Sequence, residues 1–242
     1  MVDSASVAIL IPVYNEKKTI KNIIQRCRHY SKNIIVVDDG STDDTLSEID
    51  SNFVVLMQNK INLGKGASLL KGFKYIVSCS FSGVITLDAD GQHDPADLSK
   101  FFELITKTPE SIIIGARTLN TRSAPWKRWL ANKAADAFVS LVVRKKLQDT
   151  QSGFRYYPAR FLATLDSKNI TNRFAFETEI LIKAVHSGFL INYIEICSCY
   201  PKESRHSYYQ PIRDSIAILN SIRRSIFYKK LSSRKSIDNQ AK

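Results

Sequence analysis

Two aspartates one residue apart, Asp88 and Asp90, directly follow an apolar run that ends at Leu87. Side chains at positions i and i+2 of an extended backbone lean the same way, so the two carboxylates repel each other unless a cation lies between them. Carboxylates at a strand end suit a hard divalent cation that also binds phosphate oxygens. Gln92 can add a ligand, whereas His93 is expected to cap or pack. The pattern predicts a Mg²⁺ or Mn²⁺ site formed by Asp88, Asp90 and Gln92.

Two further polar clusters also follow or precede regular elements. Asp38 and Asp39 end a second apolar run, where an acid can accept hydrogen bonds from a base or a ribose. The alternative is a plain turn in which Ser41 or Thr42 caps a short helix, and both interpretations stay open. The segment 62–66 places Lys65 between two glycines at a helix start, which favours phosphate binding. The glycine patterns of ATP-hydrolysing loops and of dinucleotide enzymes are absent from the sequence.

The elements that must position these clusters alternate between strands and helices. Apolar runs predict strands at 7–13, 33–37, 53–57, 83–87 and 111–116, and helical spacing predicts helices at 17–30, 64–79 and 96–106. Such alternation indicates an α/β fold with a mostly parallel, doubly wound sheet, in which ligands bind at the carboxyl ends of the strands. Every polar cluster falls at that edge. The second half predicts helices at 124–146 and 174–186 and strands at 153–157 and 190–200.

The positive charge is concentrated in two regions. The net charge is +12, and residues 117–146 hold eight basic residues and one acid, while residues 201–242 hold ten and three. A basic surface favours an anionic partner, although a solvated basic face is the alternative. Residues 211–230 combine an isoleucine stripe with basic residues, which is typical of a helix on an anionic membrane surface. A helix packed on its own domain remains the alternative. The organisation expected is a domain at 1–210, this helix at 211–230 and a disordered tail at 231–242.

Several classes of protein are disfavoured by the sequence. No run reaches the ~18 apolar residues of a membrane span, and no basic segment of a signal peptide precedes the first strand. We therefore expect the chain on the cytoplasmic side. The four cysteines form no C-x-x-C pair, which favours buried free thiols over a zinc site. No nucleic-acid reading motif is present, so nucleic acid is not an expected partner.

Seven motifs in order resemble those of the family 2 glycosyltransferases, which have a Rossmann-like GT-A fold. They extend over roughly residues 6–210 and are IPVYNE (11–16), VVDDGSTDDT (36–45), NLGKG (62–66), LDADGQHDP (87–95), GAR (115–117), DTQSGFRYY (149–157) and FETEIL (176–181). The sequence is most similar to the polyprenyl-phosphate branch, which includes dolichyl-phosphate mannose synthase. The stretch 203–211 departs from the R-x-x-G-x-S form of mannose synthases, so the resemblance does not imply mannose or a GDP carrier.

The resemblance implies a role for individual residues. Asp149 takes the place of a catalytic carboxylate and acts with Asp90, Arg117 and Arg128. The acceptor phosphate is expected near Arg117, Arg128, Asn132 and Arg205. The donor is expected near Pro12, Tyr14, Glu16, Asp38, Asp39, Lys65, Asp88, Ala89, Asp90 and Glu177.

The function expected from residues and resemblance together is inverting transfer of a sugar from a UDP- or GDP-sugar to a lipid phosphate. The enzyme would be peripheral on the cytoplasmic face of the membrane, alone or with a membrane-protein partner. A rival is transfer to a hydroxyl of a saccharide or of a lipid-linked glycan, which needs a positioned base, for which Asp149 is the candidate. A remote rival is a nucleotidyltransferase, which would release pyrophosphate instead of a nucleoside diphosphate.

Overall fold

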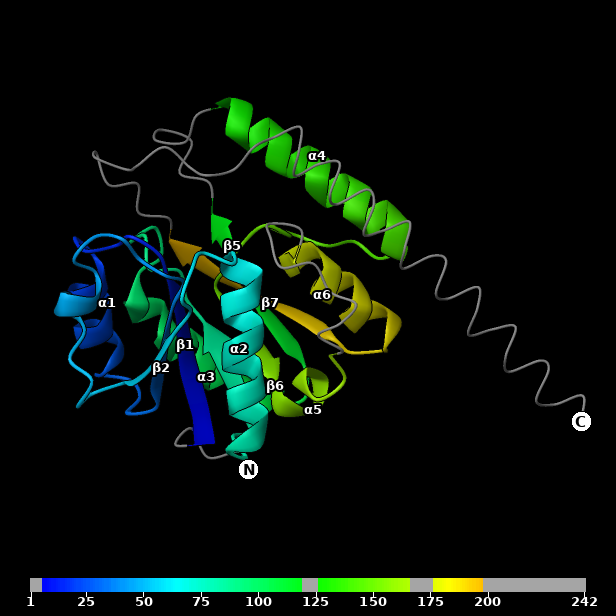
Figure 1. Ribbon diagram of the computed structural model, residues 1–242. Helices are drawn as coiled ribbons and strands as arrows, with labels where there is room; N and C mark the ends of the chain where they lie inside the picture. Colours follow the sequence, from blue (N-terminus) through cyan, green and yellow to red (C-terminus); the bar gives the residue numbers. More distant parts are fainter. Residues whose placement is uncertain (1–5, 119–125, 166–175, 198–242) are drawn as a thin grey trace, which may run out of the picture.

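A seven-stranded sheet in the order β3-β2-β1-β4-β6-β5-β7 forms the centre of the molecule (Figure 1). The computed structural model describes residues 6–118, 126–165 and 176–197, with only the backbone described over 118 and 126–131. The strands are β1 (Val7–Val13), β2 (Ile34–Asp38), β3 (Val55–Gln58), β4 (Gly83–Thr86), β5 (Ile112–Thr118), β6 (Arg155–Pro158) and β7 (Ile191–Cys197).

The sheet is mostly parallel, as the sequence predicts. β1 pairs in parallel with β2 and with β4, β2 with β3, and β5 with β7. β6 is the exception, because it runs antiparallel to both β4 and β5. β6 therefore begins at the edge where β4 and β5 end, and Thr86 at the end of β4 pairs with Arg155 at the start of β6.

Helices cover both faces of the sheet because β1 alternates its apolar side chains between two cores. Ala8 and Leu10 belong to one core, and Val7 and Ile9 to the other. The first core also receives apolar residues from α2 (Lys65–Ser78), α4 (Trp126–Val143), α5 (Ala159–Leu162) and α6 (Phe176–His186). The second receives them from α1 (Ile20–Cys27) and α3 (Leu98–Lys107).

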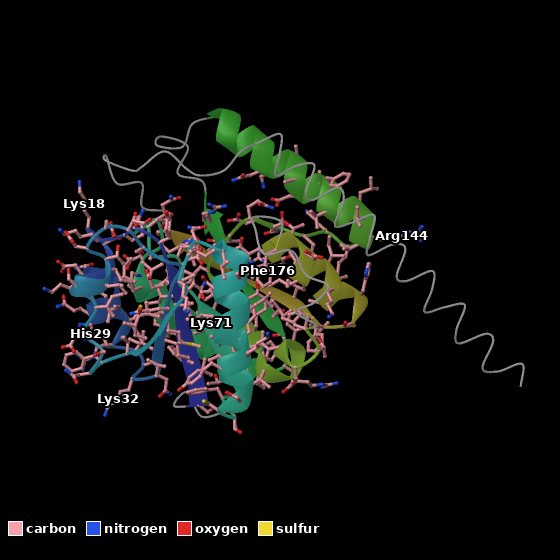
Figure 2. The ribbon with its side chains drawn as sticks, in the orientation of Figure 1. Lys18, His29, Lys32, Lys71, Arg144 and Phe176 are labelled. Atoms are coloured by element: carbon pink, nitrogen blue, oxygen red, sulfur yellow. The ribbon has the colours of Figure 1, made fainter. Side chains whose placement is uncertain are left out.

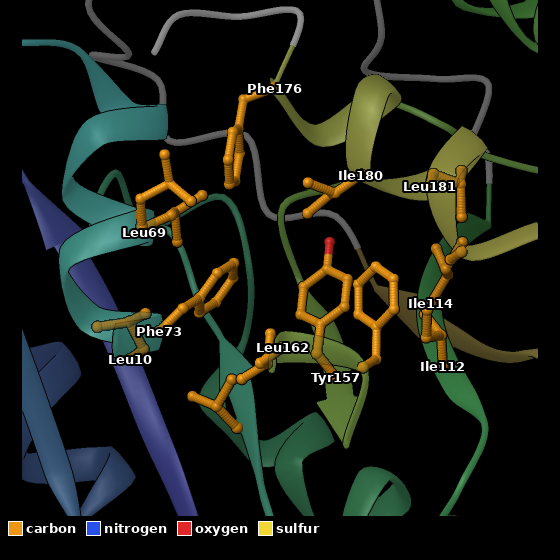
Figure 3. Close-up of a cluster of buried hydrophobic side chains, with 14 of the residues drawn as sticks. Leu10, Leu69, Phe73, Ile112, Ile114, Tyr157, Leu162, Phe176, Ile180 and Leu181 are labelled. Atoms are coloured by element: carbon orange, nitrogen blue, oxygen red, sulfur yellow. The ribbon is translucent and has the colours of Figure 1, made fainter. Parts of the chain in front are cut away.

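Aromatic side chains fill the first core beneath α2 and α6 (Figure 3). The rings of Phe73 and Tyr157 meet edge to face with their centroids 5.5 Å apart, and Phe176 lies 6.1 Å from Phe73. Phe176 is the first residue of α6, so this packing fixes the start of α6 against α2.

The structure differs from the sequence predictions at a few points. Ser41 and Thr42 cap no helix: the next helical turn is the 3-10 segment η2 (Leu46–Glu48), and both hydroxyls instead accept hydrogen bonds from Asn15. The helix expected from Ala96 begins as the 3-10 turn η3 (Pro95–Asp97) and continues as α3. The free thiol of Cys27 is buried as expected, but Cys79 and Cys197 are exposed.

The surface carries many outward-pointing cations. Figure 2 shows Lys18 and Lys32 around α1 and Arg144 at the end of α4 pointing away from the fold. Lys133, Lys145 and Lys146 are also exposed, so the described cations of the basic stretch face solvent with the exception of Arg117, which is largely buried. Within the described ranges, no helix has the length and apolar character that crossing a membrane requires. The segments predicted at 211–230 and 231–242 lie outside the described residues.

Candidate active site

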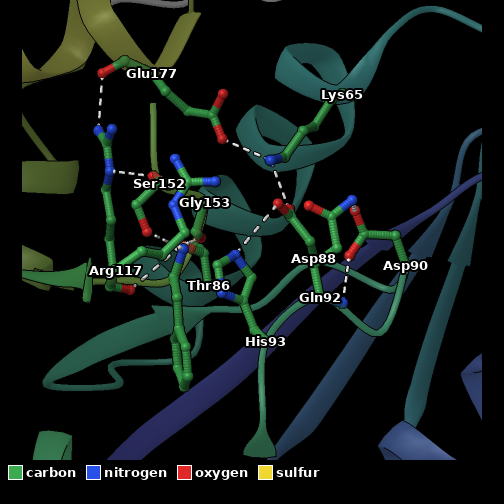
Figure 4. Close-up of polar contacts among 12 residues, drawn as sticks. Lys65, Thr86, Asp88, Asp90, Gln92, His93, Arg117, Ser152, Gly153 and Glu177 are labelled. Carbon is green, nitrogen blue, oxygen red and sulfur yellow. Dashed lines mark hydrogen bonds and ion pairs between the residues drawn. The ribbon is translucent and has the colours of Figure 1, made fainter. Parts of the chain in front are cut away.

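The polar clusters predicted from the sequence converge where β1, β2, β4 and β5 end. Because β6 is antiparallel, the chain that enters it also lies at this edge, and the hydroxyl of Thr86 donates to the carbonyl of Gly153 over 2.8 Å. Residues far apart in the sequence, including Lys65, Asp88, Arg117, Gly153 and Glu177, therefore surround one site (Figure 4).

Lys65 bridges two carboxylates at the centre of this site. Its ammonium lies 2.5 Å from Oδ1 of Asp88 and 2.6 Å from Oε1 of Glu177, and all three side chains are largely buried. Burial opposes the charge of Lys65, but the two carboxylates outweigh it and raise the pKa of the ammonium. Burial likewise opposes ionisation of Asp88, yet Lys65 and other cations lower the pKa of that carboxyl. The site thus holds an ionised Asp88 beside a positive charge.

Gly153 allows Asp88 to reach its position. A Cβ on residue 153 would lie 2.7 Å from both Cγ and Oδ1 of Asp88, and closer still to Oδ2. Carbon and neighbouring heavy atoms normally keep at least about 3.5 Å apart. No side chain larger than hydrogen therefore fits at residue 153 while Asp88 stays in place.

The turn after Asp88 orders the second predicted metal ligand. Both carboxyl oxygens of Asp90 accept hydrogen bonds from Gln92, one from its backbone at 2.9 Å and one from its side-chain amide at 2.7 Å. The turn passes through Gly91 with a φ of 75°. The hydroxyl of Thr19 donates to the carbonyl of Ala89 over 2.6 Å and anchors the segment to the start of α1.

His93 packs beneath the site, as expected, and is buried. Its ring lies 5.5 Å from that of Phe154, and its Nε2 lies 3.9 Å from Oδ2 of Asp88. Burial lowers the pKa of His93 to about 4, so the imidazole is neutral at physiological pH. In the described ranges, no three His, Cys, Asp or Glu side chains gather in a group that could hold a metal ion.

Asp38 and Asp39 shape the loops beside the site. Asp39 accepts hydrogen bonds from the backbone of Leu63 at 3.1 Å and of Gly64 at 2.8 Å, and thereby fixes the turn that leads to Lys65. Asp38 accepts from the backbone of Gly40 and of Ser41. Both carboxylates are buried, and their contacts are those of turn-forming acids.

The predicted nucleoside residues lie at and beyond the end of β1. Pro12 is buried in the strand, while Tyr14 and Glu16 are half-buried just after it. Between them, Asn15 adopts a φ of 55° and accepts hydrogen bonds from the backbone of Thr42 and of Asp43. The β1 and β2 loops are therefore joined next to Asp38.

Arg117 and Asp149 form a second charged pair. The guanidinium donates from Nε at 2.8 Å and from Nη2 at 2.6 Å to the two carboxyl oxygens, and the backbone N–H of Arg117 adds a third hydrogen bond at 2.9 Å. Burial favours the neutral acid, but these contacts with Arg117 lower the pKa of Asp149. The charge of Arg117 also helps to lower the pKa of Asp88, which places the two pairs in one site.

The other predicted acceptor residues are described only in part. Asn132 is half-buried in α4. The backbone of Arg128 belongs to the same helix, whereas its side chain and the whole of Arg205 lie outside the described residues.

Three residues that hold the site together were missed by sequence reasoning. Gly153 and Arg155 both lie within the motif DTQSGFRYY, but the motif does not indicate which side chains they contact. Asp136 is the single acid of the basic stretch 117–146, and this isolation was the available signal. All three act through contacts between residues distant in the sequence, which local patterns do not reveal.

A family model and curated relatives match most of this chain in sequence. The model of glycosyl transferase family 2 matches residues 8–168. The polyprenol monophosphomannose synthase of Mycolicibacterium smegmatis is 28% identical over 195 residues, which are 76% of this chain and 73% of that protein. The UDP-N-acetylglucosamine–dolichyl-phosphate N-acetylglucosaminyltransferase of Methanococcus voltae is 27% identical over 217 residues, 81% of this chain and 86% of that protein.

A solved structure has the same architecture. Glucosyl-3-phosphoglycerate synthase from Mycobacterium tuberculosis, in complex with Mn²⁺, UDP-glucose and phosphoglyceric acid, superimposes with a TM-score of 0.71 at 16% identity. The match covers 89% of this chain and 78% of that one. At such low identity the likeness establishes the fold alone, and it confirms the expected GT-A fold.

Proposed function

Because the chain belongs to glycosyl transferase family 2, we propose that it transfers a sugar, with inversion, from a nucleotide-sugar donor to the phosphate of a polyprenyl-phosphate lipid. The observation that carries the choice of acceptor is the Arg117–Asp149 pair. The pair places the guanidinium of Arg117 on the acceptor side of the site. Both carboxyl oxygens of Asp149 accept hydrogen bonds from that guanidinium, so the carboxylate is occupied by Arg117.

The donor half of the site is built to balance negative charge. Asp88, Asp90 and Gln92 would hold Mg²⁺ or Mn²⁺ together with the donor diphosphate. The position of the Lys65 ammonium beside Asp88 supports this assignment, because it shows that a positive charge is accommodated there. A divalent ion would stabilise the negative charge that grows on the leaving nucleoside diphosphate. Lys65, at the start of α2, supplies a second cation for the same phosphates.

The remaining residues predicted to bind the donor lie on either side of this diphosphate site. Pro12, Tyr14, Glu16, Asp38 and Asp39 would hold the nucleoside beside the ends of β1 and β2. Ala89 lies between the two metal-binding aspartates, with its carbonyl held by Thr19. Glu177 lies on the far side of Lys65, where the sugar of a UDP- or GDP-sugar would extend.

The acceptor half favours an acceptor that is already ionised. A hydroxyl must lose a proton to a positioned base, and a good base has a pKa near the working pH. The lowered pKa of Asp149 makes this carboxylate a weak base. A lipid phosphate is ionised near neutral pH and needs placement by arginine. Arg117, held by Asp149, would supply that placement with Arg128, Asn132 and Arg205.

The exposed cations in α4 and directly after it support action at a membrane surface. Each basic residue near an anionic leaflet contributes about 1 kcal/mol, and Lys133, Arg144, Lys145 and Lys146 are exposed. The 211–230 segment would add a basic amphipathic helix. The proposed location is the cytoplasmic face of the membrane, where a membrane-protein partner would present the lipid.

Radiolabelled donor offered to undecaprenyl phosphate and to free saccharides tests the proposal. A screen of UDP- and GDP-sugars with Mn²⁺ by thermal shift first identifies the donor. We expect label in the lipid fraction and none in the saccharides. Label in the saccharides alone would establish the hydroxyl-acceptor rival, and release of pyrophosphate would establish a nucleotidyltransferase.

A further inference from the structure

We propose that Asp136, in the middle of α4, is a positioning residue that sets the Arg117–Asp149 pair and so couples the placement of α4 to the acceptor side of the site. The proposal rests on the proposed function only in assigning the acceptor phosphate to Arg117. The coupling itself is a matter of contacts between α4 and the loop that precedes β6.

The carboxylate of Asp136 binds the backbone at the loop's critical residues. Its Oδ2 accepts from the N–H of Asp149 at 3.0 Å. Its Oδ1 accepts from both the N–H and the hydroxyl of Thr150, each at 2.8 Å. Asp136 is buried, with only 7% of its surface exposed, so these three hydrogen bonds stand in for its lost hydration.

The loop needs such a constraint because Asp149 has an unfavourable backbone. Its φ is 44°, in the left-handed region that residues with a side chain rarely adopt. Strained backbone persists where surrounding contacts over-determine it. This conformation aims the Asp149 carboxylate at Arg117, and Asp136 holds the two N–H groups that define it.

The buried cation Arg155 binds backbone carbonyl groups of the same loop. Arg155 donates to the carbonyl of Thr150 and to that of Ser152, each at 2.7 Å, and also to the carbonyl of Glu177 at 2.9 Å. Asp136 on the N–H side and Arg155 on the carbonyl side therefore hold the segment 149–152 between two charges of opposite sign. Arg155 links this segment to the sheet and to α6, whereas Asp136 links it to α4.

Through Asp136, the Arg117–Asp149 pair would respond to a movement of α4. α4 begins at Trp126, contains the predicted acceptor residues Arg128 and Asn132, and is followed directly by exposed cations at 144–146. A shift of α4 on binding an anionic acceptor would move Asp136, and with it the backbone of Asp149 and the guanidinium of Arg117. A displacement of about 1 Å in a positioned group can cost about 100-fold in rate.

Asp136→Asn tests the coupling with almost no change in volume. All three partners of Asp136 are donors, so the amide NH2 of asparagine would face a donor and lose at least one hydrogen bond. The matched control is Ser140→Ala. It removes another contact between α4 and the following chain, the 2.9 Å hydrogen bond from Leu147 N–H to the Ser140 hydroxyl, and leaves Asp149 and Thr150 untouched.

The direct readout is the ¹⁵N–¹H NMR signal of the Arg117 Nε–H group, assigned with an Arg117→Lys variant. In the wild type we expect a slowly exchanging signal, because this group donates to Asp149. Asp136→Asn should accelerate its exchange about tenfold or more, and Ser140→Ala should not. In lipid-phosphate transfer, Asp136→Asn should lower kcat/KM for the acceptor by about 10- to 100-fold, with the Kd of the donor changed less than twofold.

Three outcomes would overturn the proposal. The first is an unchanged Arg117 signal in Asp136→Asn, and the second is an equal loss of donor and acceptor affinity, which a merely structural role predicts. If Asp136→Asn does not fold, Thr150→Val removes one of the three donors and should produce a smaller change in the same signal. No change in Thr150→Val is the third. A wild type without transfer activity would refute the proposed function, while the NMR signal would still decide the coupling.

Discussion

Replacing Gly153 with alanine places a methyl group against the carboxylate of Asp88. The new Cβ would lie 2.7 Å from Cγ and from Oδ1 of Asp88, where about 3.5 Å is an ordinary contact. The backbone of Gly153 is held in place by the hydrogen bond from the Thr86 hydroxyl to the Gly153 carbonyl. Asp88 must therefore move by about 1 Å, which breaks its 2.5 Å contact with Lys65.

The expected loss of catalytic rate follows from this displacement of Asp88. A misplacement of about 1 Å in a reacting or ligating group costs about 100-fold in rate, which corresponds to about 2.7 kcal/mol of transition-state stabilisation. We expect Gly153→Ala to lower kcat/KM for the donor by about 100-fold. Mn²⁺-dependent donor binding, measured by calorimetry, should weaken with it.

Gly83→Ala is the matched control because it creates a similar clash at the opposite end of β4. A Cβ on residue 83 would lie 2.5 Å from Cε2 of Tyr156 and 2.6 Å from its hydroxyl oxygen. Overpacking of this kind typically costs about 1–3 kcal/mol of stability, so Tm should fall while donor affinity is retained. A Gly153→Ala enzyme with wild-type donor affinity and rate would refute the assignment of Asp88 to the donor site.

The remaining predictions concern the charged groups and the C-terminal segment. Asp90→Asn should reduce turnover at least 100-fold and weaken metal-dependent donor binding; normal rates would remove Asp90 from the site. Lys65→Met should strengthen Mn²⁺ binding without donor, measured by EPR, because a competing cation is gone, and should weaken donor binding about tenfold; weaker Mn²⁺ binding would contradict its role as a counter-charge. Asp149 has a lowered pKa in the folded protein, so its pairing stabilises the fold above the ordinary carboxyl pKa of about 4, and this stability is lost as pH falls through the folded pKa. Asp149→Asn should therefore be less stable than wild type at pH 7, and the difference in denaturant midpoint should shrink below about pH 4; a constant difference would be inconsistent with the ion pair. Deleting 211–242 should reduce binding to anionic liposomes more than activity on a water-soluble, short-chain lipid phosphate; unchanged liposome binding would favour a packed helix.

Local patterns in the sequence were sufficient to predict most of the scaffold. The side chains of Val7–Val13 alternate between the two cores, as expected for a strand buried on both faces. The apolar stripe of residues 17–30 packs into one of these cores. The position of Asp88 and Asp90 after a buried strand also predicted the edge of the sheet at which the polar clusters converge. These features depend on residues within one element, so the sequence is enough to read them.

The contacts that decide the chemistry depend on pairing between distant elements. Nothing near Asp149 in the sequence indicates that Arg117, 32 residues earlier, binds both of its oxygens. The antiparallel direction of β6 brings Gly153 against Asp88, and a strand's direction is not evident from its apolar pattern. Asp149 was therefore the candidate base from its motif, whereas its geometry favours an electrostatic role.

The most direct test of the account compares two acceptors that differ only in their phosphate. Purified enzyme, Mn²⁺ and the identified nucleotide-sugar are incubated with a polyprenyl phosphate or with the free polyprenol of the same chain length. The nucleoside diphosphate released is then quantified against the glycolipid formed. We expect one nucleoside diphosphate for each glycosyl phosphate lipid, and no product with the polyprenol. Equal transfer to the polyprenol hydroxyl would contradict this expectation.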